Sequence, residues 1–135
     1  MSDRFIETII EVATKAPGSR ILVVTPRRAT VMQEIDAAVS ATSLKTTYRA
    51  PYSEYALSNG SVIQLGQITS TRDTHRYAGA EFQLIAFDDM ERYSIKDVAY
   101  MESRLRAEGR LREDMDAQGL QLSSTFRGKG GAGNG

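Results

Sequence analysis

The sequence predicts an α/β fold with a mostly parallel sheet, and three observations lead to that prediction. Residues 21–24 (Ile-Leu-Val-Val) and 84–87 (Leu-Ile-Ala-Phe) are short apolar runs, typical of strands buried on both faces. Helical patterns precede and follow these runs, and such alternation is typical of layered α/β folds. A hairpin signal lies between the two runs. We therefore expect a parallel sheet flanked by helices, with an inserted β-hairpin.

Composition limits the functions that the chain can have. Its 135 residues suit at most one domain, and a hydrophobic content of 41% is enough for a core. Lys+Arg and Asp+Glu number 17 each, so no overall positive field favours nucleic acid. There is no cysteine and only one histidine, His75, which excludes disulfides and a histidine-rich metal site. Without a membrane-length apolar run or a signal peptide, we expect a cytosolic chain with no membrane partner.

The first predicted elements are a helix, a strand and a second helix. Residues 2–16 have amphipathic spacing, with Ser2 as a possible cap and Pro17-Gly18 as the stop. After the strand at residues 21–24, Thr25 can cap a helix whose first position is Pro26. The apolar face of that helix is Ala29, Met32, Ile35 and Val39. Arg27 and Arg28 follow the strand end, either as contacts to phosphate or as solvated arginines.

The next segment, residues 42–52, looks irregular. Its aromatic residues Tyr48 and Tyr52 lie near the basic residues Lys45 and Arg49. Aromatic and basic side chains together can bind single-stranded nucleic acid by stacking, although a surface loop has the same composition. Both interpretations stay open.

A hairpin is predicted where residues 55–57 and 62–65 flank Ser58-Asn59-Gly60-Ser61. Asn-Gly between strand-like runs favours a tight turn, with positive φ at both Asn59 and Gly60.

The run at residues 84–87 ends in two adjacent carboxylates, Asp88 and Asp89. Ligands of parallel sheets bind at the carboxyl ends of the strands, and Mg²⁺ prefers carboxylate and phosphate oxygens. The pattern therefore fits a nucleotide hydrolase, with one acid near the metal and the next near the attacking water. The alternative is a buried strand followed by acidic loop residues.

The last third of the chain predicts one helix and one strand. Ser94 and Asp97 resemble a capping box, and we expect Ile95, Val98, Met101 and Leu105 to give the helix its buried stripe. Arg104 near its end either suits the helix dipole or reaches a phosphate. Residues 107–119 look like a solvated excursion. Residues 120–125 read as a strand ending in Ser124 and Thr125, whose hydroxyls can sense a γ-phosphate or can simply be loop residues.

Taken together, these features resemble the ATPase part of the large terminase subunit, the DNA-packaging motor of tailed bacteriophages. The resemblance is carried by residues 77–90, followed by Tyr93 and residues 103–106, and its most specific segment is 77–106. Residues 21–26, the hairpin loop at 59–61 and residues 122–125 fit the same pattern.

The resemblance implies a partial P-loop NTPase sheet of the ASCE type and roles for five residues. Asp88 would hold Mg²⁺ on ATP, and Asp89 would replace the glutamate that activates water, although it is one methylene shorter. Ser124 and Thr125 would belong to the coupling motif, and Arg104 would act in trans. The implied partners are double-stranded DNA and other motor subunits or the portal, in the cytoplasm of the bacterial host.

The sequence also departs from the family, because it contains no GxxxxGK[ST] phosphate loop (Walker A). We therefore expect a truncated ATPase domain at residues 1–127, a Gly-rich flexible tail at 128–135 and no nuclease domain. Such a fragment would bind ATP weakly or not at all, unless a second chain supplies Walker A. A helicase-like ATPase fragment and a non-catalytic module that binds DNA or a motor partner remain alternatives.

Overall fold

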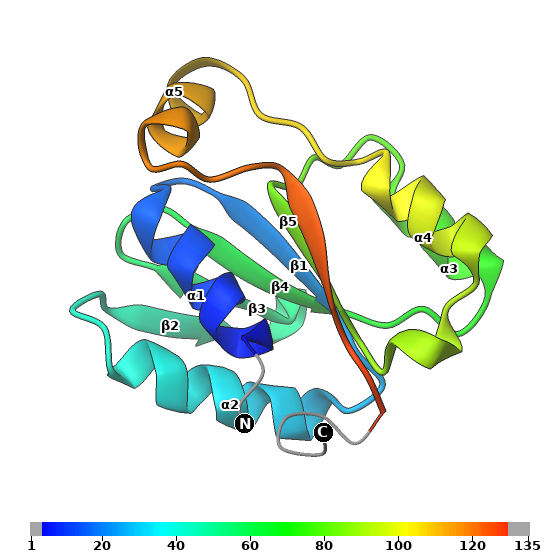
Figure 1. Cartoon of the computed structure of the whole chain (residues 1–135). Coiled ribbons are helices and arrows are strands. Elements are labelled where there is room, and N and C mark those ends of the chain that lie inside the picture. The colour runs from blue at the N-terminus through cyan, green and yellow to red at the C-terminus, as the bar shows by residue number, and fades with distance from the viewer. Residues whose placement is uncertain (1–3, 130–135) are drawn as a thin grey trace.

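The computed structural model describes residues 4–129 and contains one six-stranded sheet with helices on both faces (Figure 1). The strands are β1 (Arg20–Val24), β2 (Thr46–Arg49), β3 (Glu54–Leu57), β4 (Val62–Gly66), β5 (Leu84–Asp88) and β6 (Ser123–Arg127). The helices are α1 (Phe5–Lys15), α2 (Arg28–Ser40), α3 (Thr71–Thr74), α4 (Ile95–Glu102) and α5 (Gly109–Ala117). Three 3₁₀ turns, η1 (Ala50–Tyr52), η2 (His75–Tyr77) and η3 (Met90–Arg92), complete the described elements.

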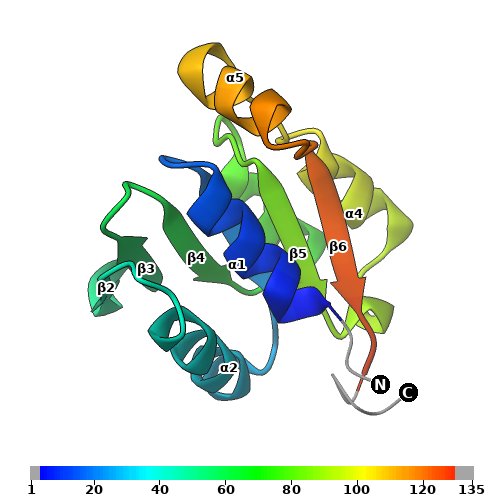
Figure 2. The ribbon, with the colours of Figure 1, turned by 60° about the vertical axis from the view of Figure 1, so that its left-hand side comes forward.

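The strand order is β2-β3-β4-β1-β5-β6, and the four strands from β4 to β6 are parallel to one another. The predicted α/β class and the buried strands at residues 21–24 and 84–87 are confirmed. β3 and β4 form the predicted hairpin, and β4 also pairs with β1, so the hairpin extends the main sheet. β2 adds an antiparallel strand at one edge. At the opposite edge β6 pairs only with β5, which leaves its outer side open within the described chain (Figure 2).

Two apolar layers cover the two faces of the sheet, because successive side chains of a strand point to opposite faces. Ile21 and Val23 of β1 pack with α1 and α2 on one face. Leu22 and Val24 pack on the other face with Met101 of α4 and with Tyr77. Residues 21–24 of β1 and 84–87 of β5 are therefore all apolar and buried, as expected for strands covered on both faces.

The hairpin loop is tied to the end of α1, and this contact places the hairpin against the parallel strands. Asn59 Nδ2 and Ser61 Oγ both donate to the Ala13 carbonyl, at 2.9 and 2.8 Å. These bonds satisfy a carbonyl in the last turn of α1. The expectation of positive φ at both central residues was wrong: Gly60 has φ 92°, whereas Asn59 is not among the positive-φ residues. The loop is longer than a two-residue turn, with Leu57 N bonded to Ser61 O at 2.9 Å.

Several predicted boundaries were wrong. Residues 42–52 contain β2 and η1, and residues 107–119 contain α5, so neither segment lacks regular structure. α2 begins at Arg28, and Thr25 therefore does not cap it. α4 is capped by Ser94 as predicted, through a 3.1 Å bond from Asp97 N, but it ends at Glu102. Ile95 is 90% exposed and does not belong to the buried stripe.

Two expectations concern the chain ends and membranes. The proposed cap Ser2 and residues 130–135 of the predicted tail lie outside the described residues. No helix among residues 4–129 is long and apolar enough to cross a membrane.

Candidate functional site

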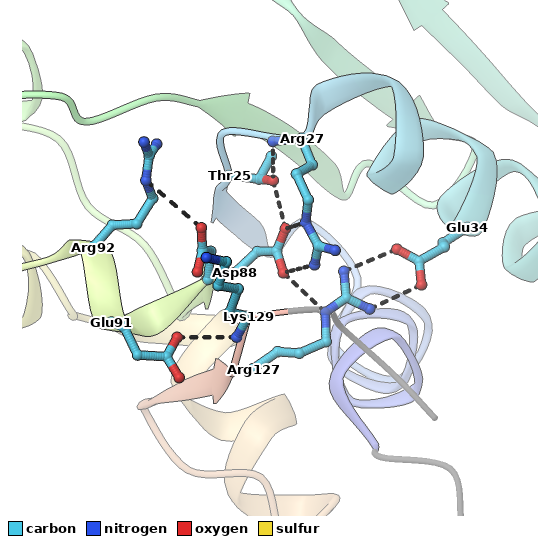
Figure 3. Close-up of polar contacts among 9 residues, drawn as sticks. Thr25, Arg27, Glu34, Asp88, Glu91, Arg92, Arg127 and Lys129 are labelled. Carbon is cyan, nitrogen blue, oxygen red and sulfur yellow. Dashed lines mark hydrogen bonds and ion pairs between the residues drawn. The ribbon is translucent and has the colours of Figure 1, made fainter. Parts of the chain in front are cut away.

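The candidate site lies at the carboxyl ends of β1, β5 and β6, where Asp88 is the last residue of β5. Asp88 is paired in register with Arg127 of β6. Thr25 directly follows β1, the strand on the other side of β5. Figure 3 shows the side chains of Arg27 and Arg127 meeting at the Asp88 carboxylate. The predicted position of Asp88 at a strand tip is thus confirmed, and Thr25 shares that rim.

The Asp88 carboxylate accepts four hydrogen bonds. Its Oδ2 accepts from Thr25 Oγ1 at 2.7 Å and from Arg27 Nε at 3.1 Å. Its Oδ1 accepts from Arg27 Nη2 at 2.5 Å and from Arg127 Nε at 3.0 Å. The side chain is fully buried. A carboxylate has about four lone-pair sites, so these donors use its whole capacity.

Arg127 joins the site to the helical layer. Its Nη1 and Nη2 donate to the two carboxylate oxygens of Glu34 on α2, at 2.8 and 2.9 Å. Its guanidinium also lies over the ring of Phe5, 4.5 Å from the ring centre. The side chain is nearly buried, so the two carboxylates and the ring replace the water that it loses.

The four charges of this cluster balance: Arg27 and Arg127 oppose Asp88 and Glu34. Burial alone would raise the pKa of Asp88, but the hydrogen bonds from Arg27, Thr25 and Arg127 outweigh burial and hold it below its usual value. Burial likewise opposes the charged form of Arg127, but Glu34 and Asp88 raise its pKa. Hydrogen bonding to Asp88 raises the pKa of Arg27. Asp88, Arg27 and Arg127 are therefore ionised around neutral pH.

Asp89 adopts a left-handed backbone conformation, with φ 61° and ψ 55°. Asp tolerates this region better than most residues, so the turn after β5 suits this residue. Its Oδ2 lies 3.6 Å from Arg92 Nε, and the side chain is mostly buried. Asp89 is thus adjacent to the Asp88 cluster in sequence but is paired with a different arginine.

In their present arrangement, the side chains at this rim do not offer Mg²⁺ a set of free oxygen ligands. All lone-pair sites of Asp88 are occupied, and two of its three partners are cations that would repel a metal ion. No group of three or more acidic or histidine side chains that could hold a metal occurs among residues 4–129. The role of Asp88 as a metal ligand stays a prediction, and it requires Arg27 to leave the carboxylate.

The structure does not place Ser124 and Thr125 at the strand tip, and that expectation was wrong. They pair in register with Ile85 and Ala86, in the first half and middle of β6. Ser124 Oγ donates to the Glu102 carboxylate of α4. β6 begins three residues later than predicted and continues to Arg127, so Arg127 occupies the tip.

Arg104 lies at the opposite rim of the sheet. Its carbonyl accepts from Phe82 N at 2.9 Å, just before β5 begins, whereas Asp88 ends that strand. At about 3.3 Å per residue, the two rims are roughly 20 Å apart along the strand. The Arg104 guanidinium lies 5.8 Å from the centre of the Tyr100 ring. Within one chain it cannot reach Asp88, so only the trans-acting role that was expected remains possible.

Sequence reasoning missed three features of the cluster. It did not pair Arg27 with Asp88, and it did not identify Arg127 or Glu34 as members. Phe126 favours strands, and extending the predicted strand beyond Thr125 would have brought Arg127 into it; in the structure Arg127 is level with Asp88. No comparable sequence signal pointed to Glu34, which lies 93 residues from its partner Arg127.

No family model and no curated protein sequence matches this chain. Its structure is similar to that of the large terminase from a thermophilic bacteriophage in two crystal forms. The TM-scores are 0.67 and, for the form in complex with ADP, 0.65, each at 8% sequence identity. Each match covers 90% of this chain and 29% of that chain, so this chain spans less than a third of that terminase. The bacteriophage Phi-29 packaging motor assembly matches at a TM-score of only 0.46. The chain thus has the fold of part of a large terminase.

Proposed function

We propose that this chain, folded like part of a phage large terminase, belongs to an ATP-driven DNA-packaging motor and is inactive alone. The observation that carries the proposal is the position of Asp88: buried, at the carboxyl end of a central parallel strand, beside Thr25. That is the edge at which parallel α/β sheets bind their ligands.

The open edge of β6 supports the proposal that a further strand completes the site. β6 is parallel to β5 and pairs with no other described strand. A parallel strand added there would end at the same rim as Asp88. Such a strand can carry the phosphate loop that residues 4–129 do not contain, from a second chain or from another part of a longer one.

The predicted residue roles belong to this completed motor. We assign Asp88 to the nucleotide site, Asp89 to water activation and Ser124 and Thr125 to coupling. Arg104 remains a candidate for action on a neighbouring subunit. The partners would be double-stranded DNA and other motor subunits or the portal, in the host cytoplasm.

The saturated Asp88 explains why the chain alone is expected to be inactive. Binding a cation would require breaking the two bonds that Arg27 makes to a buried carboxylate. The same observation favours a second candidate, a non-catalytic module that binds DNA or a motor partner. In that case the cluster has a purely structural role.

Titration with mant-ATP and Mg²⁺ separates the two candidates. The chain alone should show no saturable binding and no hydrolysis. Mixed with the product of a neighbouring reading frame that carries GxxxxGK[ST], it should bind and hydrolyse ATP, and Asp88→Ala should abolish turnover. Binding in neither setting would refute the motor proposal and leave the module. Turnover by the chain alone would refute its inactivity.

A further inference from the structure

A polar cavity lies at the carboxyl ends of β1 and β4, on the other side of β1 from Asp88. Its volume is about 200 Å³, and Thr25, Ser53 and Gln67 contribute to its lining. The guanidinium-bearing side chains of Arg28 and Arg76 also line it, and none of its lining residues is acidic. Two arginines and several hydroxyl or amide groups around one small cavity favour an oxyanion.

Arg28 is the better placed of the two arginines to hold an anion. It is the first residue of α2 and donates to the Tyr48 hydroxyl, but it forms no ion pair among the described residues. The first turn of α2 has no acidic residue and no capping side chain, so no side chain of the helix itself offsets the positive end of its dipole. Arg76 forms an ion pair with Asp73 at 3.5 Å, and the Arg76 side chain is 61% exposed.

An exposed aromatic residue directly precedes one of the residues that line this cavity. Tyr52 ends η1, is 65% exposed and precedes Ser53, which lines the cavity. Ser53 has φ 52°, a left-handed conformation that a serine adopts only at some cost. The Arg49 guanidinium lies 5.8 Å from the centre of the Tyr52 ring. The segment therefore carries an exposed aromatic side chain one residue before Ser53 of the cavity lining.

We propose that this surface binds single-stranded nucleic acid, with one backbone phosphate in the cavity and a base stacked on Tyr52. Arg28 and Arg76 would hold the phosphate oxygens. Stacking on an aromatic side chain requires an unpaired base, so the surface should prefer a single strand to a duplex. This inference does not rest on the motor proposal, because it needs neither nucleotide nor a second chain.

Fluorescence anisotropy with a labelled oligothymidine tests the phosphate contact. Arg28→Gln and Arg76→Gln should each weaken binding. Each should also make the negative slope of log K against log[salt] shallower by about 0.7. The matched control is Arg110→Gln, the same charge change on exposed α5, near the amino ends of the strands (Figure 1). It should leave the slope unchanged. Equal slopes for all three variants, or no binding by the wild type, would overturn the proposal.

Tyr52 provides a second test. Tyr52→Ala should weaken oligothymidine binding at least about fivefold, whereas Tyr52→Phe keeps the ring and should bind like the wild type. Equal affinities for the two variants would overturn the stacking contact. Two further arms address other ligands. A duplex bound as tightly as the single strand would overturn the strand preference. If Arg28→Gln and Arg76→Gln lose binding of mant-ATP but still bind the oligonucleotide like the wild type, the cavity binds a free nucleotide, and the nucleic-acid proposal is overturned.

Discussion

Asp88→Asn is the substitution that probes the buried cluster most cleanly, because it removes the charge with almost no change of shape. The carboxylate is fully buried and accepts from three side chains. Asparagine has one acceptor oxygen, and its amide group would face donors that now meet the second oxygen. At least one guanidinium N–H therefore loses its partner in a buried place.

The expected cost follows from the partners that remain. Removing one member of a buried ion pair costs about 3–5 kcal/mol. Arg127 keeps both bonds to Glu34, and Arg27 is 30% exposed and can turn toward water. Because both arginines keep a partner or reach water, we expect the loss to be at the lower end of this range, about 3 kcal/mol. That is a large share of the roughly 5–15 kcal/mol typical of a whole domain.

Urea unfolding followed by far-UV circular dichroism measures this loss as a change in the free energy of unfolding. The matched control is Asp89→Asn, the same change one residue later. Asp89 has φ 61°, which asparagine tolerates equally well, and its arginine is 3.6 Å away. The control should cost less than about 1 kcal/mol. If both variants lose the same free energy, the four bonds to Asp88 do not stabilise the fold as described.

Three further predictions concern pH, packing and exposure. The pKa of Asp88 is lowered in the folded state, so its contribution to the free energy of unfolding is present above the unfolded pKa of about 3.9 and is lost as pH falls. The difference in urea midpoint between the wild type and Asp88→Asn should therefore shrink below about pH 4. A Cβ at Gly66 would overlap the Tyr77 hydroxyl, so Gly66→Ala should cost about 1–3 kcal/mol, and Tyr77→Phe should recover part of that loss in a double-mutant cycle; strictly additive losses would contradict the contact. Met101→Ala should cost about 2–5 kcal/mol, whereas Ile95→Ala should change the free energy of unfolding by less than about 0.5 kcal/mol, and equal losses would contradict the assigned exposures.

The parts of the fold that local patterns determine were predictable. The runs at residues 21–24 and 84–87 became β1 and β5 because continuous apolar residues suit strands covered on both faces. Ser94 caps α4 because its hydroxyl accepts from the Asp97 amide in the first turn of the helix.

The parts that depend on distant partners were not predictable from local patterns. Arg27 looked like a solvated residue or a phosphate contact, but its partner Asp88 lies 61 residues away. Ile95 has helical spacing with Val98, yet it lies in the first turn of α4 and is exposed. Residues 46–49 form β2 only because β3 offers a pairing edge, which composition does not reveal.

The central claim is that the arginines and Thr25 occupy the whole Asp88 carboxylate in this chain. The carboxyl carbon resonance of Asp88, observed by NMR while Mg²⁺ and ATP are added to the chain alone, tests it most directly. We predict that this resonance stays unmoved throughout the titration. A saturable shift that requires Mg²⁺ would show that the carboxylate binds the metal, and would contradict the claim.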